Sequence, residues 1–254
     1  MKVLRDIWLV FGRYFGLLIR NPVWVALGVL QPLLYLILFA PLLSKSLTRL
    51  PGFPPGGAYN VFVPGLLVQL GMFGAAGVGF SLIAELRMGV IERLRVTPVS
   101  RVALLLGRAM RDVISIVLQS LILIVLALPF GLSIHPVGVI VVLALIGLIG
   151  LLTASIAYAV ALWLRSEDSY APLIFTSSLP ILLLSGVLLP MQLAPQWLQN
   201  IAAINPLLYA VDAARHVFND NLTDPSVTKG VLIMAVLCVI AVVIGARQFG
   251  RAVA

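Results

Sequence analysis

Residues 137–162 read VGVIVVLALIGLIGLLTASIAYAVAL, and this stretch decides the fold class. It contains no charged residue, and it exceeds the roughly 20 apolar residues that a helix needs to cross a bilayer core. Comparable apolar blocks recur along the 254-residue chain, which is 61% hydrophobic and only 10% charged. Because a typical soluble domain has about 25% charged residues, this chain has too little polar material to cover a surface that faces water. We therefore predict an all-α, polytopic membrane protein.

Six spans are predicted in a single domain, residues 1–254. The spans are about 23–43, 61–84, 105–131, 137–162, 172–189 and 230–246. An even number of spans places both termini on one side of the membrane, and most of the lysine and arginine residues fall on that side. Basic residues accumulate on the cytoplasmic side of membrane proteins, so we expect both termini to be cytoplasmic. Anionic membrane lipids then explain the formal net charge of +8, and nucleic acid is not an expected partner.

Two segments outside the spans are predicted to be helical. Residues 1–20 carry Arg5, Asp6 and Arg13 within one sector of a helix and aromatic side chains over most of the rest. This pattern is typical of an amphipathic helix that lies in the membrane interface. Residues 190–229 are too apolar for a free loop, so we expect short re-entrant helices on the outer side, with their backbone groups paired internally.

The sequence shows no catalytic or metal-binding constellation. His135 and His216 stand in separate outer segments without metal-ligand spacing, and Cys238 lies alone in an apolar run. No G-x-S-x-G elbow is present, and none of the lysines stands in a P-loop. We therefore predict no catalytic residue, no metal and no cofactor on this chain. If ATP drives the protein, a partner chain binds the nucleotide.

A secondary carrier is an alternative, because proton-coupled or ion-coupled carriers generally keep an ionisable residue at mid-membrane. Arg108, Arg111 and Asp112 come closest, near the cytoplasmic start of the third span. We interpret them as side chains that snorkel to the interface, together with a local ion pair. A carrier without an internal charge needs another source of energy, and that source can lie outside the membrane.

A smooth face marks the second span, where Gly71, Ala75 and Gly79 recur every four residues. Small residues at this spacing allow close helix approach. The approach can occur within the chain or between subunits, and the spacing alone favours neither.

The loop 85–104 follows the second span and contains the segment ERLRVTPVSR. Apolar residues stack at every fourth position of 86–94, opposite Glu85 and Glu92. This pattern predicts a short amphipathic helix that continues from the second span into the cytoplasm, with Thr97 as the cap of the helix that leads into the third span. Such a surface suits docking onto another protein, and a solvated interfacial helix is the alternative.

Two stretches resemble one known family. They are ERLRVTPVSR followed by LLLGR in the loop, and LLSGVLLPMQLAPQWLQNIAAINPLLYAVDAAR around the fifth span. Over nearly its whole length the chain resembles the membrane subunit, or permease, of a type-2 ATP-binding-cassette (ABC) exporter of the daunorubicin-resistance type. The second stretch is the more specific, because six residues of an outer re-entrant motif keep the family's spacing. They are Pro190, Trp197, Asn205, Pro206, Tyr209 and Arg215.

This resemblance implies that two copies of the chain, or one copy and a paralogous permease, pair with two cytosolic ATPase subunits in a bacterial cytoplasmic membrane. ATP and Mg²⁺ would bind to the ATPase subunits, so this chain itself would not be an enzyme. The residues expected to couple it to the ATPase are Glu85, Glu92, Arg93, Arg95, Thr97 and Pro98. The residues expected at the translocation interface are Gly71, Ala75, Gly79, Ser177, Ser178 and Ser185.

The predicted function is export of a hydrophobic or amphipathic compound, such as a drug, a polyketide or a lipid-like molecule. Multidrug efflux and antibiotic resistance would follow from it. The uncharged, apolar spans favour such a cargo over sugars and ions. Two alternatives remain, because the resembled family also includes exporters of lipid-linked polysaccharides, and an ATP-independent membrane carrier or scaffold has a similar composition.

Overall fold

Helices form almost all of the described protein. The computed structural model describes residues 2–21, 23–46, 57–90, 100–132, 135–188 and 190–252. In chain order the helices are α1 (Lys2–Arg20), α2 (Val23–Ser46), α3 (Gly57–Ala76), α4 (Val78–Arg87), α6 (Arg101–Ala127), α7 (Pro136–Leu164), α8 (Glu167–Leu184), α9 (Gln196–Ala202), α10 (Pro206–Phe218) and α11 (Pro225–Ala252), with 3₁₀ turns at Leu128–Phe130 and Met191–Leu193. Helix is the only regular secondary structure within these ranges, so the all-α prediction is confirmed.

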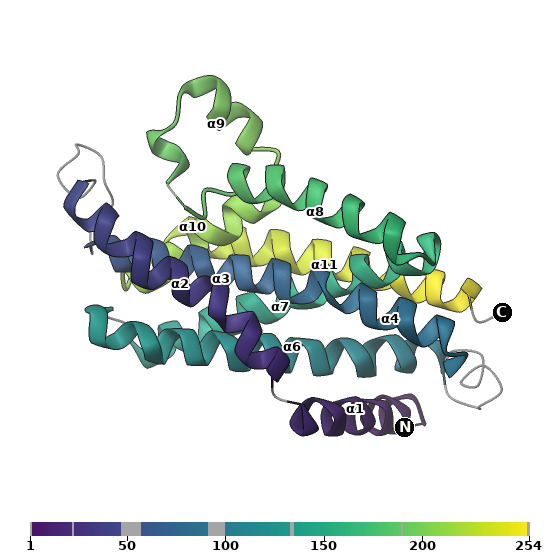
Figure 1. Cartoon of the computed structure of the whole chain (residues 1–254). Helices are drawn as coiled ribbons and strands as arrows, with labels where there is room; N and C mark the ends of the chain where they lie inside the picture. The colour runs from purple at the N-terminus through teal and green to yellow at the C-terminus, as the bar shows by residue number, and fades with distance from the viewer. Residues whose placement is uncertain are drawn as a thin grey trace.

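The helix α7 is the centre of the bundle and contacts α3, α4, α6 and α11. The helix α1 packs on α6, α2 packs on α3 and α6, and α10 packs on α11 and α3. Figure 1 shows α8 and α9 on the upper side of the bundle and α1 at its lower edge. The start of α1, the end of α4 and the end of α11 lie at the same end of the bundle, which we call the terminal end (Figure 1).

The described residues contain four helical segments long and apolar enough to cross a membrane. They are Tyr59–Arg87, Val102–Phe130, Pro136–Leu164 and Pro225–Gly250. The helices α1 and α2 form a bent pair, and counting that pair as one span raises the number to five. The predicted span 172–189 corresponds to α8, which has 18 residues and begins with Glu167 and Asp168. This helix does not meet the same criterion, and the six-span count stays a prediction.

The N-terminal segment forms a helix, as predicted, and α1 uses one face of it to pack on the bundle. Phe11, Tyr14 and Leu18 are buried, and α1 contacts α6. Leu9 remains exposed on the other side of the helix, and Trp8 is exposed beside Phe11, with the two ring centroids 5.3 Å apart. Apolar residues therefore occupy two faces of α1, one toward α6 and one away from it. A location in the membrane interface agrees with this arrangement and stays a prediction.

The segment 190–229 contains short helices, as expected for this apolar stretch. The 3₁₀ turn at Met191–Leu193 is followed by α9 and α10, and most of α10 is buried. The last residues of the segment already belong to α11, which begins at Pro225. The depth of these helices in a membrane stays a prediction.

The loop 85–104 is described only at its two ends. Glu85 lies in the last turn of α4, which ends at Arg87. The prediction of a helix that continues without a break from the second span is wrong at this point, because Met88 and Gly89 form a turn in which Gly89 has φ 69°. Residues 91–99 lie outside the described residues. Five predicted coupling residues fall there, namely Glu92, Arg93, Arg95, Thr97 and Pro98. The prediction that Thr97 caps the next helix is wrong, because Ser100 is the N-cap of α6 and its hydroxyl accepts a hydrogen bond of 3.1 Å from Ala103 N.

Candidate functional site

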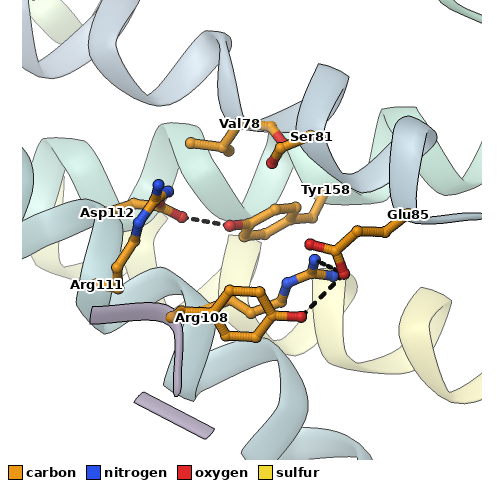
Figure 2. A network of polar contacts seen from close by, with 8 residues as sticks. Val78, Ser81, Glu85, Arg108, Arg111, Asp112 and Tyr158 are labelled. Atoms are coloured by element: carbon orange, nitrogen blue, oxygen red, sulfur yellow. Dashed lines mark hydrogen bonds and ion pairs between the residues drawn. The ribbon is translucent and has the colours of Figure 1, made fainter. Parts of the chain in front are cut away.

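A group of charged and phenolic side chains lies inside the bundle, where four helices meet. Its members come from α1, α4, α6 and α7, and we call them the ionic cluster. They are Tyr14, Glu85, Arg108, Arg111, Asp112 and Tyr158. Figure 2 shows how Glu85 and Arg108 point toward each other, with Tyr158 and Asp112 beside them.

The first half of the ionic cluster joins three helices through Arg108. This residue is only 3% exposed, and its Nη2 atom forms an ion pair with Glu85 Oε2. The Tyr14 hydroxyl donates a 2.9 Å hydrogen bond to the same carboxylate oxygen. The Arg108 guanidinium lies 4.6 Å from the centre of the Tyr14 ring, a distance at which a cation is attracted by the ring face. Glu85 of α4, Arg108 of α6 and Tyr14 of α1 are thereby held together.

The second half of the ionic cluster is centred on Asp112, which lies four residues after Arg108 and is 2% exposed. Its carboxylate accepts a hydrogen bond from the Tyr158 hydroxyl of α7 and a 2.5 Å hydrogen bond from Arg111 Nη1. The spacing of four residues places Arg108 and Asp112 on one face of α6. This face turns toward α7, so the second half connects α6 to the centre of the bundle.

The ionic cluster is electrically balanced but not completely hydrogen-bonded. Two carboxylates face two guanidinium groups, which reduces the cost of placing charges in an apolar interior. The Arg108 Nη1 atom is buried and has no hydrogen-bond partner among the described residues. Ionisable groups inside a membrane-spanning region are expensive and are usually kept for a function. The ionic cluster is therefore the leading candidate for a functional site.

The interpretation of Arg108 as a snorkelling side chain is wrong. Its head group does not reach the surface, because Glu85 and Tyr14 meet it inside the bundle. The local ion pair between Arg111 and Asp112 is present, as expected. The four-residue spacing of Arg108 and Asp112, together with the cost of placing charge in a span, could have identified this face of α6 as a candidate site from the sequence. Neither Tyr14 nor Tyr158 carries a comparable signal in the sequence.

The small residues of the second span are buried within the chain. A Cβ atom on Gly71 would lie 3.2 Å from the Ile149 side chain of α7, and one on Gly79 would lie 2.1 Å from the Tyr170 hydroxyl of α8. Ala75 is fully buried as well. The close approach thus occurs within the chain, which is one of the two alternatives that the spacing left open. A role in translocation stays a prediction for these three residues.

The three serines of the fifth predicted span all bond to backbone oxygens nearby. The Ser177 hydroxyl donates to Leu173 O at 2.7 Å, and the Ser178 hydroxyl donates to Ile174 O at 2.5 Å. Ser185 lies at the end of α8 and bonds Leu182 O at 2.6 Å. Ser177 and Ser178 also line a cavity between α7 and α8, whereas Ser185 does not.

The outer motif holds α10 against its neighbours. Asn205 caps α10 by accepting a 3.1 Å hydrogen bond from Leu207 N, and it donates a 2.7 Å bond to Ile181 O of α8. Arg215 is 5% exposed and donates to Val61 O at 3.1 Å and to Gly186 O at 2.6 Å.

Burial lowers the pKa of Arg215 to about 10, which still leaves the guanidinium charged at neutral pH. This charge is held mainly by backbone carbonyl oxygens, because Asp212 Oδ1 lies 3.8 Å away. Arg215 therefore ties α10 both to α3 and to the segment that follows α8.

The other members of the outer motif shape the turns around it. Pro190 precedes the 3₁₀ turn, and Pro206 begins α10. The Tyr209 hydroxyl donates a 2.9 Å bond to Ala203 O, while the Trp197 side chain is exposed on α9.

Comparison with known proteins identifies the class to which this bundle belongs. Residues 5–219 match the family described as ABC-2 type transporter. The chain belongs to this family. The resemblance inferred from the loop and the outer motif is thus confirmed, and this ABC-2 type transporter chain is a multi-pass membrane protein and the transmembrane component of an ABC transporter.

Three relatives illustrate how far the similarity extends. The chain is 30% identical over 220 residues to ycf38 of Cyanophora paradoxa, which is named as a transport permease, covering 85% of this chain and 75% of that protein. It is 28% identical over 176 residues to YbhR of Escherichia coli (strain K12), named as a multidrug ABC transporter permease, covering 65% of this chain and 46% of that protein. It is 24% identical over 201 residues to the daunorubicin resistance ABC transporter permease protein DrrB1 of Streptomyces coeruleorubidus, covering 75% of this chain and 67% of that protein.

Within the described residues, no group of three or more histidine, cysteine, aspartate or glutamate side chains is arranged to hold a metal ion. The two histidines each pair with one carboxylate, His135 with Asp220 at 3.2 Å and His216 with Asp224 at 3.5 Å.

Proposed function

We propose that this chain is the permease subunit of an ATP-driven exporter, and that the ionic cluster passes the movement of a partner ATPase to the bundle. Membership of the ABC-2 type transporter family supports the first part. The observation that carries the second part is the buried contact of Glu85 with Arg108 and Tyr14, which joins α4 to α6 and α1. In this proposal two copies of the chain, or this chain and a paralogous permease, pair with two cytosolic ATPase subunits that bind ATP and Mg²⁺.

The helix α4 acts as the lever in this mechanism. Its last turn holds Glu85, and the chain continues from it into the proposed coupling segment 91–99. Gly77 separates α3 from α4 within the second span, but its backbone stays helical (φ −65°, ψ −21°), so a displacement of α4 also acts on α3. A displacement of the coupling segment reaches Glu85 first. Arg108 and Tyr14 then follow, because leaving a buried charge without its partner is costly.

We also infer that the terminal end of the bundle faces the cytoplasm of a bacterial cell. Basic residues gather near it: Arg87 at the end of α4 pairs with Glu167 at the start of α8, and Arg165 follows α7. Arg108 and Arg111 lie in the first turns of α6, which begins at Arg101. Cytoplasmic segments carry such an excess of arginine and lysine. Both termini are then cytoplasmic, and the segment with α9 faces outward.

Reconstitution with the ATPase subunit that co-purifies with the chain tests the coupling proposal. Glu85→Gln keeps the size of the side chain and removes the charge that meets Arg108. We expect ATP hydrolysis to continue while the amount exported per ATP falls by about fivefold or more. A fivefold effect is at the lower end of the range that typical coupling free energies produce. Arg87→Gln is the matched control on the same helix, because the pair of Arg87 with Glu167 is exposed at the surface and contributes little.

This experiment has three possible outcomes. A selective loss of export in Glu85→Gln supports the proposal, provided that both variants insert and melt like the unmodified protein. Equal export per ATP in Glu85→Gln and the unmodified protein overturns it. A loss of folded protein in Glu85→Gln is resolved by Glu85→Asp, which keeps the charge and should restore export.

A further inference from the structure

A cavity of about 480 Å³ lies between α7, α8 and the α9–α10 segment. Met72 and Ala76 of α3 close its inner side, and Ile156 of α7 and Ile204 before α10 are among the residues that line it. Pockets of a few hundred cubic ångströms are the size that drug-sized ligands fill. The cavity does not include any member of the ionic cluster, so it is a separate feature of the bundle.

The wall of the cavity is chemically uniform. Its lining contains no charged residue among the described residues, and four polar residues contribute to it, namely Thr153, Ser177, Ser178 and Asn205. The three hydroxyl protons are already used by backbone carbonyls, since Thr153 donates to Ile149 O at 2.8 Å and the two serines donate within α8. The Asn205 amide bonds to Ile181 O and Leu207 N.

Because the polar groups of the wall already have hydrogen-bond partners, they limit which ligands the cavity can accept. A charged or sugar-like group would lose its hydrogen bonds to water on entry and would find no opposite charge and almost no free donor in exchange. Burying an unpaired charge or polar group in this way is strongly unfavourable. An uncharged apolar group that enters from the membrane breaks no hydrogen bond, and van der Waals packing against the apolar wall stabilises it.

The rim of the cavity is apolar as well. Ile156 is 47% exposed and Ile204 is 83% exposed, and both line the cavity. A ligand dissolved in the apolar part of a membrane therefore meets no polar barrier at this rim. The wall formed by α8 is bounded by two residues with left-handed backbone conformations, Arg165 with φ 54° and Gly186 with φ 71°, which mark sharp changes of direction at both of its ends.

We infer that this cavity binds the uncharged, apolar part of the cargo and excludes charged and sugar-like groups. The inference rests on the proposed transport function for the identity of the occupant as cargo. It commits to a small, neutral, apolar molecule from the membrane phase and not to the acyl chain of a resident phospholipid. A lipid-linked polysaccharide could place only its lipid part here.

Two fluorescent probes that differ in one charged group test the inference. N-phenyl-1-naphthylamine is neutral, and 1-anilinonaphthalene-8-sulfonate has the same ring system with an added sulfonate. Each probe is titrated against the purified full-length chain in phosphatidylcholine nanodiscs, and the signal of empty nanodiscs is subtracted. We expect the neutral probe to bind saturably. The sulfonate probe should bind at least about tenfold more weakly, a factor that corresponds to about 1.4 kcal/mol.

Variants that fill the cavity locate the binding. Ile156→Trp and Ile204→Trp each add an apolar ring at the rim and should weaken the neutral probe by about tenfold, because the ring occupies part of the cavity. Ile140→Trp is the matched control, since Ile140 is a 68% exposed isoleucine on the same helix α7 as Ile156 and does not line the cavity. Its affinity for the probe should stay that of the unmodified protein.

The possible outcomes are distinct. Unchanged binding in both filling variants, or equal affinity for both probes, overturns the inference. Less phosphatidylcholine co-purified in detergent with the filling variants than with the unmodified protein shows that a phospholipid chain is the occupant and also overturns it. Because the assay needs no ATPase, its failure leaves the coupling proposal untouched, and a normal Glu85→Gln variant leaves the cavity assignment untouched.

Discussion

Arg108 and Asp112 illustrate how charge is kept inside an apolar bundle. Each side chain is buried, and each meets both an opposite charge and a tyrosine hydroxyl or ring. Removing one partner of such a group leaves a buried charge uncompensated, which costs more than the pair itself contributes. The tyrosines complete the ionic cluster, Tyr158 by a hydrogen bond to Asp112 and Tyr14 by a ring contact with Arg108.

Tyr158→Phe should destabilise the protein without changing its packing. The variant keeps the ring and removes the hydroxyl that donates to Asp112. We expect the free energy of unfolding to fall by about 1–3 kcal/mol, the cost of leaving a buried acceptor without a donor. Thermal melting of the purified protein in detergent measures the change.

A tyrosine on α2 provides the control for this substitution. The Tyr35 ring packs edge-on against Phe39 with a centroid distance of 6.1 Å, and the described residues provide no hydrogen-bond partner for its hydroxyl. Tyr35→Phe should therefore melt like the unmodified protein. An equal loss of stability in both variants would show that the Asp112 contact does not stabilise the fold.

At the scale of elements, α4 is the short helix that connects the ionic cluster to the rest of the loop. It contains ten residues, begins after Gly77 and ends at Arg87. Its buried residues face the bundle, while Arg87 is exposed beside Glu167. The predicted coupling segment follows directly, so any force on that segment acts on the end of α4 that holds Glu85.

Reversing Arg93 and Arg95 to glutamate should uncouple ATP hydrolysis from export. Both residues lie in the predicted coupling segment, and charge reversal would repel the ATPase surface that accepts them. We expect insertion into the membrane to be normal and export to fall by about fivefold or more. Export and ATP hydrolysis are measured together in reconstituted vesicles.

Arg247→Glu serves as the control for the charge of this region. Arg247 is exposed on α11, near the same terminal end of the bundle. Its reversal should leave export close to that of the unmodified protein. Normal transport by the Arg93 and Arg95 double variant would remove these two residues from the coupling surface.

At the scale of the whole molecule, α2 and α8 present large apolar faces outward. Leu34 and Leu38 are exposed on α2, and Phe175, Leu179 and Leu183 are exposed on α8. In a membrane such faces meet either lipid or another subunit. The proposed pairing of two copies would cover part of them.

A single cysteine at position 179 tests the proposed homodimer. Cys238 is the only cysteine of the chain, so Cys238→Ser provides a background without thiols. In that background we expect Leu179→Cys to form a disulfide-linked dimer under mild oxidation. The proposed pairing would bring position 179 of the two copies together, and a disulfide forms only between closely spaced α-carbons. Val236→Cys, at an exposed position of α11, should remain monomeric on a non-reducing gel. Cross-linking at 236 but not at 179 would place the interface on α11 and overturn the assignment to α8.

The sequence by itself determined the class of the protein and most of its helices. Uninterrupted apolar length predicts 137–162 as a span, and α7 covers it from Pro136 to Leu164. The outer motif and the loop sequence were sufficient to recognise the family that residues 5–219 match. These features are local, because helix formation and membrane insertion depend on the residues of one segment.

Only the tertiary structure decided which side chains meet. Tyr14 and Glu85 are 71 positions apart, and Asp112 and Tyr158 are 46 apart, so no spacing rule connects them. The same holds for the cavity, whose wall is assembled from α3, α7, α8 and the α9–α10 segment. Hydrophobic periodicity reports which face of a helix is apolar, but the rotation of one helix against another is set by packing. That rotation brings Arg108 to Glu85 inside the bundle. From the sequence alone, Arg108 was interpreted as an ordinary charged side chain at the membrane surface.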